Sequence, residues 1–164
     1  MSESSRPYPW HIDLEDAAAA PSRRPDFVQY LRANGRPDDD YGAAELIFGE
    51  LVGNAYLHAR GPLEMAVEWS EGHAVLHVTD QGGPIDLASA RMPAESSEHG
   101  RGLAIVRALA PQVHATTYPG YGKTISVALP VRARDAVRRI GSPGAVRYGR
   151  GPQRGRGVLD LRLA

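Results

Sequence analysis

Three polar residues share one face of a segment whose pattern is otherwise that of an apolar helix. Residues 41–58, YGAAELIFGELVGNAYLH, predict an α-helix, and Glu50, Asn54 and His58 stand four residues apart along it. Side chains at this spacing project from the same side of a helix. A carboxylate beside a ligand can orient and deprotonate an attacking hydroxyl or water, and an amide carbonyl oxygen can ligate magnesium. A solvated helix face has the same pattern, so the row alone does not decide between the two.

A second candidate is an aspartate that ends a predicted strand and meets a tight turn. Asp80 is followed by QGG, so Gly82 lies two residues downstream. The carboxylate can accept a hydrogen bond from an exocyclic amine such as that of adenine, and Gly82 lets a ring approach the backbone. An ordinary turn has the same composition, because Asp and Gly are default turn residues. Thr124, in GKT, has a hydroxyl that can support Asp80, although threonine is also simply a good strand residue.

A third candidate is a glycine-rich loop directly before a predicted helix. Gly100 and Gly102 flank Arg101, and an apolar helical pattern begins at Leu103. Glycine N–H groups at a helix N-terminus can hold a phosphate, because no side chain is in the way and the helix dipole favours an anion. A turn at the helix boundary explains the glycines equally well. Arg101 fits a phosphate contact, a partner contact or plain exposure.

Periodicity and turn signals outline the elements that must position these residues. Ser22 is the predicted N-cap of a first helix that Gly35 closes, and Gly49 and Gly53 indicate a close approach to the backbone of the second. The predicted helices are 22–35, 41–58 and 103–110, and the predicted strands are 10–15, 63–70, 73–80, 114–119 and 124–131. This order predicts an α+β fold: a two-layer sandwich in which about three helices cover one face of a mostly antiparallel or mixed sheet.

Composition limits the classes of protein to which this chain can belong. The chain has 164 residues, 42% of them apolar, which suits one domain with a real core. It has no cysteine, which excludes disulfides and thiolate metal sites. The sequence contains neither an apolar run of membrane-spanning length nor the pattern of a signal peptide. We therefore expect a cytoplasmic protein without a membrane partner.

Charge divides the chain into two parts. Residues 132–164 hold nine arginines and two aspartates, whereas residues 1–131 hold ten basic and seventeen acidic residues. We predict a folded domain over 1–131 and a basic extension rich in Gly and Arg over 132–164. The extension is solvated and mobile, folds back on the body of the protein, or has a partner of its own. Tyr148 is its single aromatic residue, which argues against nucleic acid as that partner.

The motifs together, in this order, resemble those of the GHKL ATPase superfamily, which includes histidine kinases, gyrase and Hsp90. ELVGNA resembles its N box, DQGG its G1 box, GRGL its G2 box and GKT its final threonine motif. The resemblance covers roughly residues 8–131. Within the superfamily, AELIFGELVGNAYLHA is similar to the anti-sigma factor serine kinases of bacterial stress and sporulation switches.

The resemblance implies the Bergerat sandwich fold, with ATP and magnesium bound between helix and sheet. It implies that Glu50 is the general base, that Asn54 is the magnesium ligand, and that Asp80 holds the adenine amine with support from Thr124. The nucleotide contacts that it implies are Asn54, His58, Asp80, Gly82, Gly100, Arg101, Gly102, Leu103 and Thr124. It also implies an ATP lid over residues 85–99 and an assisting arginine, Arg23 or Arg24.

Members of the group phosphorylate a serine on an anti-sigma antagonist and sequester a sigma factor as a homodimer, so the resemblance implies these partners here. The alternative is a nucleotide-gated partner switch without turnover. A histidine kinase is disfavoured, because His11, the one early histidine, lies in a strand-like segment without a long helix pair. The chain departs from the family at Pro84, where a second glycine is usual, since proline fixes φ and lacks an N–H. The basic extension has no family counterpart.

Overall fold

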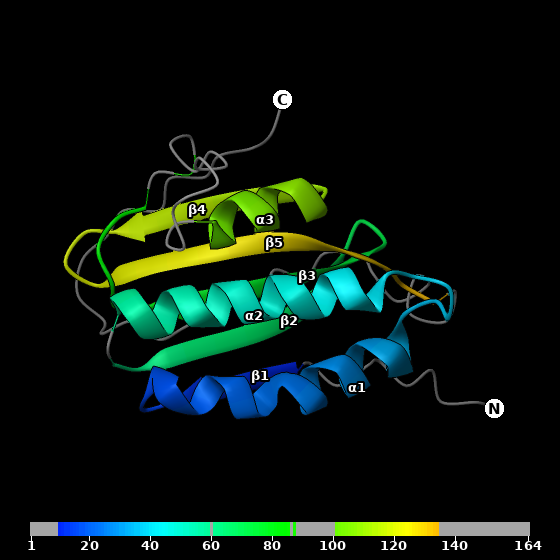
Figure 1. Ribbon diagram of the computed structural model, residues 1–164, viewed down its shortest axis with the longest axis horizontal. Coiled ribbons are helices and arrows are strands. Elements are labelled where there is room, and N and C mark those ends of the chain that lie inside the picture. The colour runs from blue at the N-terminus through cyan, green and yellow to red at the C-terminus, as the bar shows by residue number, and fades with distance from the viewer. Residues whose placement is uncertain (1–9, 60, 86, 88–100, 135–164) are drawn as a thin grey trace.

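The protein is built on one open antiparallel sheet. The computed structural model describes residues 10–59, 61–85, 87 and 101–134. The strand order is β1-β2-β3-β5-β4, and every neighbouring pair is antiparallel (Figure 1). The strands are β1 (Trp10–Leu14), β2 (Leu63–Ser70), β3 (His73–Asp80), β4 (Gln112–Tyr118) and β5 (Gly122–Arg132).

Helices cover one face of this sheet. They are α1 (Arg24–Asn34), α2 (Tyr41–His58) and α3 (Gly102–Leu109), and a 3-10 helix, η1 (Ala17–Arg23), precedes α1. Figure 1 shows α2 lying over the middle of the sheet, roughly along the strands, with α1 beside it toward β1 and α3 beside it toward β4. The predicted α+β sandwich is confirmed. None of the helices in the described ranges is long and apolar enough to cross a membrane.

Helix α2 has the bounds that its sequence pattern predicts. Asp40 caps its start, because its carboxylate accepts the backbone N–H of Ala43 at 2.9 Å. Its buried residues recur at helical spacing and face the sheet. They are Tyr41, Ala44, Ile47, Phe48, Leu51, Val52 and Ala55. The polar row of Glu50, Asn54 and His58 lies outside this stripe, so packing leaves it free for another role.

The predicted N-cap at Ser22 is wrong. Ser22 lies inside η1, where its hydroxyl donates to the carbonyl of Ala19 at 2.7 Å. Helix α1 begins after Arg23, whose side chain makes no capping bond. The physical reason lies upstream, where Asp16 caps η1 by accepting the N–H of Ala18 at 2.8 Å. The chain is therefore already helical before it reaches Ser22.

The predicted hairpin of β2 and β3 is confirmed. Glu71 and Gly72 form its two-residue turn with φ of 51° and 84°. Positive φ at both positions is typical of a type I′ turn, whose twist matches that of the flanking strands. The hairpin brings β3 to its central place in the sheet, where its last residue, Asp80, lies beside β5.

A cluster of aromatic rings joins the helices to the edge of the sheet. Phe27 of α1 stacks on Phe48 of α2 with 4.6 Å between ring centroids. Trp10 of β1 meets Phe27 edge-on at 5.6 Å. Offset and edge-to-face contacts of this kind stabilise a core beyond the burial of their area. The cluster fixes one side of α2, and its other side faces α3 (Figure 1).

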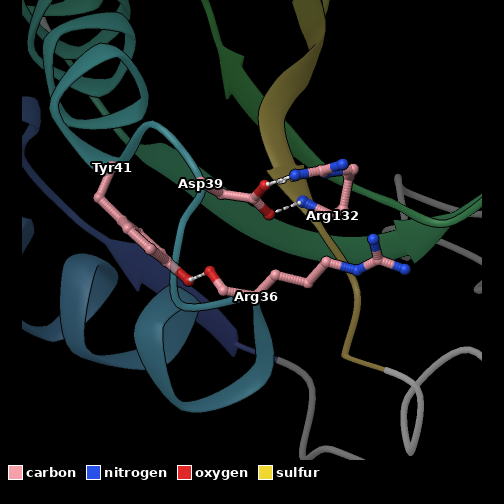
Figure 2. Close-up of polar contacts among 4 residues, drawn as sticks. All are labelled: Arg36, Asp39, Tyr41 and Arg132. Carbon is pink, nitrogen blue, oxygen red and sulfur yellow. Dashed lines mark hydrogen bonds and ion pairs between the residues drawn. The ribbon is translucent and has the colours of Figure 1, made fainter.

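Figure 2 shows how the connection between α1 and α2 is fastened to the end of β5. The Asp39 carboxylate, whose side chain is 3% exposed, accepts the backbone N–H of Arg132 at 2.5 Å and its guanidinium at 2.7 and 2.8 Å. The Tyr41 hydroxyl donates to the carbonyl of Arg36 at 2.7 Å. Burial, and after it the charge of Asp39, raises the pKa of Tyr41, which favours this neutral donor form.

Contacts with the domain continue past residue 131, where the sequence places its boundary. The Arg134 guanidinium donates to the carbonyls of Gly35 and Arg32 at 2.6 and 2.9 Å, at the C-terminal end of α1. A cation is favourable there, because the last carbonyls of a helix are unpaired and partly negative. Residues 132–134 thus pack on the domain, and the rest of the predicted extension, 135–164, lies outside the described residues.

Removal of the Asp39 carboxylate tests this fastening. We expect Asp39→Ala to lower the free energy of unfolding by about 1–3 kcal/mol, because it leaves the N–H of Arg132 without its acceptor. Asp38→Ala, at an exposed position in the same loop, is the matched control and should change it by less than about 0.5 kcal/mol. Urea unfolding measures both variants. Equal stability of the two would contradict the role given to Asp39.

Candidate functional site

The polar row of α2 meets the N-terminus of α3. Glu50 and Asn54 are half-buried, and His58 is exposed. A Cβ added at Gly102, the first residue of α3, would lie 2.6 Å from Glu50 Oε2. The carboxylate therefore rests where Gly102 has no side chain. The first N–H groups of a helix are unpaired and partly positive, so this place attracts a negative group.

A buried ion pair lies at the end of β3. Asp80 and Lys123 are the two buried polar residues of the described chain, with side chains 1% and 3% exposed. Lys123 Nζ donates to Asp80 Oδ1 at 2.7 Å. Charges are seldom buried unless they are paired, because removal from water costs several kcal/mol per ion. The burial of each charge in this pair is therefore stabilised by the other charge.

The pair leaves one oxygen of Asp80 without a partner. Oδ1 accepts two donors, Lys123 Nζ and the N–H of Gly82, both at 2.7 Å. Oδ2 is buried and accepts no hydrogen bond within the described residues. An unmet buried acceptor is costly, and native proteins have few of them. The arrangement is that of an acceptor prepared for a ligand that donates a hydrogen bond.

Helix α2 contacts both the Asp80 turn and the start of α3. A Cβ added at Gly82 would lie 3.4 Å from the carbonyl oxygen of His58, the last residue of α2. The Asp80 turn therefore lies at the C-terminal end of the helix, whereas Gly102 lies beside Glu50. At 1.5 Å per residue, Glu50 and His58 are roughly 12 Å apart along the axis, with Asn54 midway. The structure thus brings two segments that are distant in sequence, the Asp80 turn and the start of α3, to the C-terminal half of α2.

Glycine at position 122 sets the start of β5 against the end of β3. Gly122 has φ of 117°, a conformation that side chains rarely adopt. A Cβ added there would lie 1.9 Å from the carbonyl oxygen of Asp80. The close approach holds the strands in a register that pairs Asp80 with Lys123. Lys123 faces the helix side as a consequence.

The structure does not place Thr124 beside Asp80, which corrects the expected support. Thr124 pairs with Thr79 across the strands, and their hydroxyls lie 2.8 Å apart. Successive residues of a strand point to opposite faces, so Thr124 faces away from the helices. It lines a hollow on the outer face of the sheet with Thr116 and Tyr118.

Sequence reasoning missed Lys123. The motif GKT offers one signal. Neighbouring residues of a strand face opposite sides of the sheet, so Lys123 must face the side opposite to that of Thr124.

The other predicted site residues lie as follows. Gly100 lies outside the described residues, as does the predicted lid apart from Ile85 and Leu87. Arg101 is the N-cap of α3 and makes no side-chain capping bond. Leu103 is half-buried and packs against the core.

Arg24, one of the two predicted assisting arginines, lies against Gly49 of α2. A Cβ added at Gly49 would lie 2.9 Å from the Arg24 guanidinium, so Arg24 crosses α2 at this glycine. The predicted close approach is therefore confirmed at Gly49, one residue before Glu50. A Cβ at Gly53 would meet no described atom within 4 Å. Arg23 instead lies 3.8 Å from the Asp26 carboxylate.

Comparison with known proteins adds independent findings. The sequence matches a family model described as a histidine kinase-like ATPase domain over residues 14–129. No curated protein matches it. Among solved structures it is similar to the Acinetobacter baumannii histidine kinase AdeS, with 15% sequence identity, a TM-score of 0.45, and coverage of 74% of this chain and 67% of that chain. The range matched by the family model contains Glu50, Asn54, Asp80 and Gly102.

The ion pair makes a prediction about stability. We expect Lys123→Met to lower the free energy of unfolding by about 3–5 kcal/mol, because Asp80 is left as a buried charge without a cation. The double variant Asp80→Asn with Lys123→Met should recover a large part of this loss, since neither side chain is then charged. Denaturant unfolding at neutral pH measures both. A double variant no more stable than Lys123→Met would show that the pairing is not the reason.

Proposed function

Because this chain belongs to the histidine kinase-like ATPase domain family, we propose that it binds ATP with magnesium along the polar face of α2. One observation carries the proposal: α2 contacts the Asp80 turn at its C-terminal end and the N-terminus of α3 beside Glu50. An acceptor for a base and a helix N-terminus for phosphates therefore lie along one helix, as a nucleoside triphosphate requires.

At the end of the site near His58, Asp80 receives the base. Its Oδ2 is the buried acceptor without a partner in the described chain, and the exocyclic amine of adenine is a suitable donor. Gly82 supports this assignment, because its lack of a side chain lets a flat ring lie close to the backbone. The carbonyl end of α2 at His58 borders the same place.

At the other end, the triphosphate lies against the start of α3. Gly102 and Leu103 provide backbone N–H groups at the helix N-terminus, and the family resemblance adds Gly100 and Arg101. Asn54, between the two ends of the row, would hold magnesium through its side-chain oxygen. Bound magnesium neutralises charge on the phosphate oxygens. Asn54 fits this role, because an amide oxygen is a ligand that magnesium accepts.

The proposed reaction is transfer of the γ-phosphoryl group to a serine hydroxyl of a partner protein. Glu50 accepts the hydroxyl proton while the serine oxygen bonds to the γ-phosphorus and the bond to ADP breaks. The half-buried place of Glu50 beside Gly102 supports this role. The similarity of AELIFGELVGNAYLHA to anti-sigma factor kinases supports an anti-sigma antagonist as the substrate and a sigma factor as the protein held by the homodimer.

A carboxylate-to-amide change separates binding from transfer. We expect Glu50→Gln to bind MgATP as the wild type does but to transfer phosphate 10²–10⁴-fold more slowly, because the amide accepts no proton. Glu15→Gln, the same change at an exposed position away from the polar row, is the matched control and should transfer at the normal rate. Calorimetry measures binding, and labelled ATP measures transfer to partners captured from the source cell.

The outcomes distinguish the alternatives. Transfer undiminished in Glu50→Gln would remove Glu50 as the base. Wild-type protein that binds MgATP and captures a partner only with ATP, but never transfers phosphate, would be a nucleotide-gated switch. A wild-type protein that does not bind MgATP would contradict the proposed function.

A further inference from the structure

We infer that Lys123 reads the nucleotide base together with Asp80, donating a hydrogen bond to ring nitrogen N1 while Asp80 accepts one from the 6-amino group. The inference rests on the proposed function and names a specificity-determining residue for the same site. Its basis is the buried pair at the junction of β3 and β5, where a donor and an acceptor lie side by side.

The hydrogen bonds of the pair leave unused capacity on both partners. Lys123 Nζ carries three N–H donors, and its one hydrogen bond to the described residues goes to Asp80 Oδ1. Oδ1 is fully engaged, because it also accepts the N–H of Gly82. Oδ2 is engaged by no described donor. A ligand at this place therefore meets a free carboxylate oxygen next to an ammonium with donors to spare.

This pairing of groups complements the edge of adenine. Adenine presents a donor, the 6-amino group, beside an acceptor, N1. Hypoxanthine presents the reverse order, a 6-oxo acceptor beside an N1–H donor. If Asp80 takes the 6-position, adenine satisfies both protein groups, whereas hypoxanthine sets its oxygen against the carboxylate. A buried polar group left unpaired by the wrong base is a strong source of discrimination.

The turn that follows Asp80 lies against the pair at Gly82. A Cβ at Gly82 would lie 2.7 Å from Lys123 Nζ and 2.8 Å from Asp80 Oδ1. The neighbouring residues Gln81, Gly83 and Pro84 are exposed and belong to no helix or strand. For a base to reach the pair this turn must move, and the hydrogen bond from the Gly82 N–H to Asp80 Oδ1 lies within it.

Nucleotide analogues test the contact atom by atom. We would measure the affinity of the wild-type protein for the magnesium complexes of ATP, 1-deaza-ATP and ITP. 1-Deaza-ATP keeps the amine but has C–H in place of N1, and ITP has hypoxanthine as its base. We expect 1-deaza-ATP to bind on the order of 10-fold more weakly than ATP, because a hydrogen bond from a charged donor is lost. ITP should bind more weakly than ATP as well.

Substitution then assigns the lost bond to Lys123. In Lys123→Met, the affinity for ATP should fall to that for 1-deaza-ATP, so that their ratio becomes about one. The double variant Asp80→Asn with Lys123→Met has no buried charge. If Lys123→Met alone does not fold, the double variant provides the measurement instead, and its ratio of the two affinities should also be about one. A purely structural lysine would instead weaken both nucleotides equally and leave the ratio unchanged.

Three results would overturn the inference. Equal wild-type affinity for ATP and 1-deaza-ATP would exclude a bond to N1. A ratio that survives the loss of Lys123 would assign that bond elsewhere. ITP bound more tightly than ATP would reverse the order of donor and acceptor. In the first two cases the proposed ATP site would stand, and in the third a nucleotide site of other base preference would stand, whereas a wild-type protein that binds no nucleotide would remove both proposals.

Discussion

The register of β3 against β5 is the constraint on which the site depends. Gly122 allows the start of β5 to touch the Asp80 carbonyl, and this contact pairs Asp80 with Lys123 on the side that faces the helices. A slip of β5 by one residue would turn Lys123 to the outer face and bring Thr124 inward, while β3 would keep its place beside β2. The register therefore decides whether the buried Asp80 carboxylate has a cation beside it.

Helix α2 joins the two ends of the site because its faces differ. Its apolar stripe packs on the sheet, and aromatic stacking of Phe48 on Phe27 fixes its position toward β1. The polar row of Glu50, Asn54 and His58 beside this stripe takes no part in that packing. Gly102 lets Glu50 lie against α3, and Gly82 lets the Asp80 turn approach His58. The same helix thus supplies core stability and the line along which a nucleotide can extend.

Local signals in the sequence predicted much of this fold. The bounds of α2 and of the β2–β3 hairpin follow from periodicity and a two-residue turn, which are local properties. The resemblance assigns Glu50 and Gly102 to one nucleotide site, but their direct contact depends on how α3 packs on α2. The partner of Asp80 does not follow from local signals, because register is set by pairing across the sheet, and the residue opposite Asp80 is Lys123, one position before the expected Thr124. The sequence alone groups Arg132 with the basic extension. Its ion pair with Asp39 cannot be found from local patterns, because the two residues are distant in sequence.

The central claim is that one nucleotide lies along α2 and engages both the Asp80 turn and the start of α3. Nuclear magnetic resonance of the isotope-labelled wild-type protein, titrated with MgATP, tests both ends in one measurement. The account predicts that the backbone amides of Gly82 and Gly102 shift together at one affinity, while that of Ile12 on the distant strand β1 does not. Amide shifts confined to the outer face around Thr116, or absent at either glycine, would contradict it.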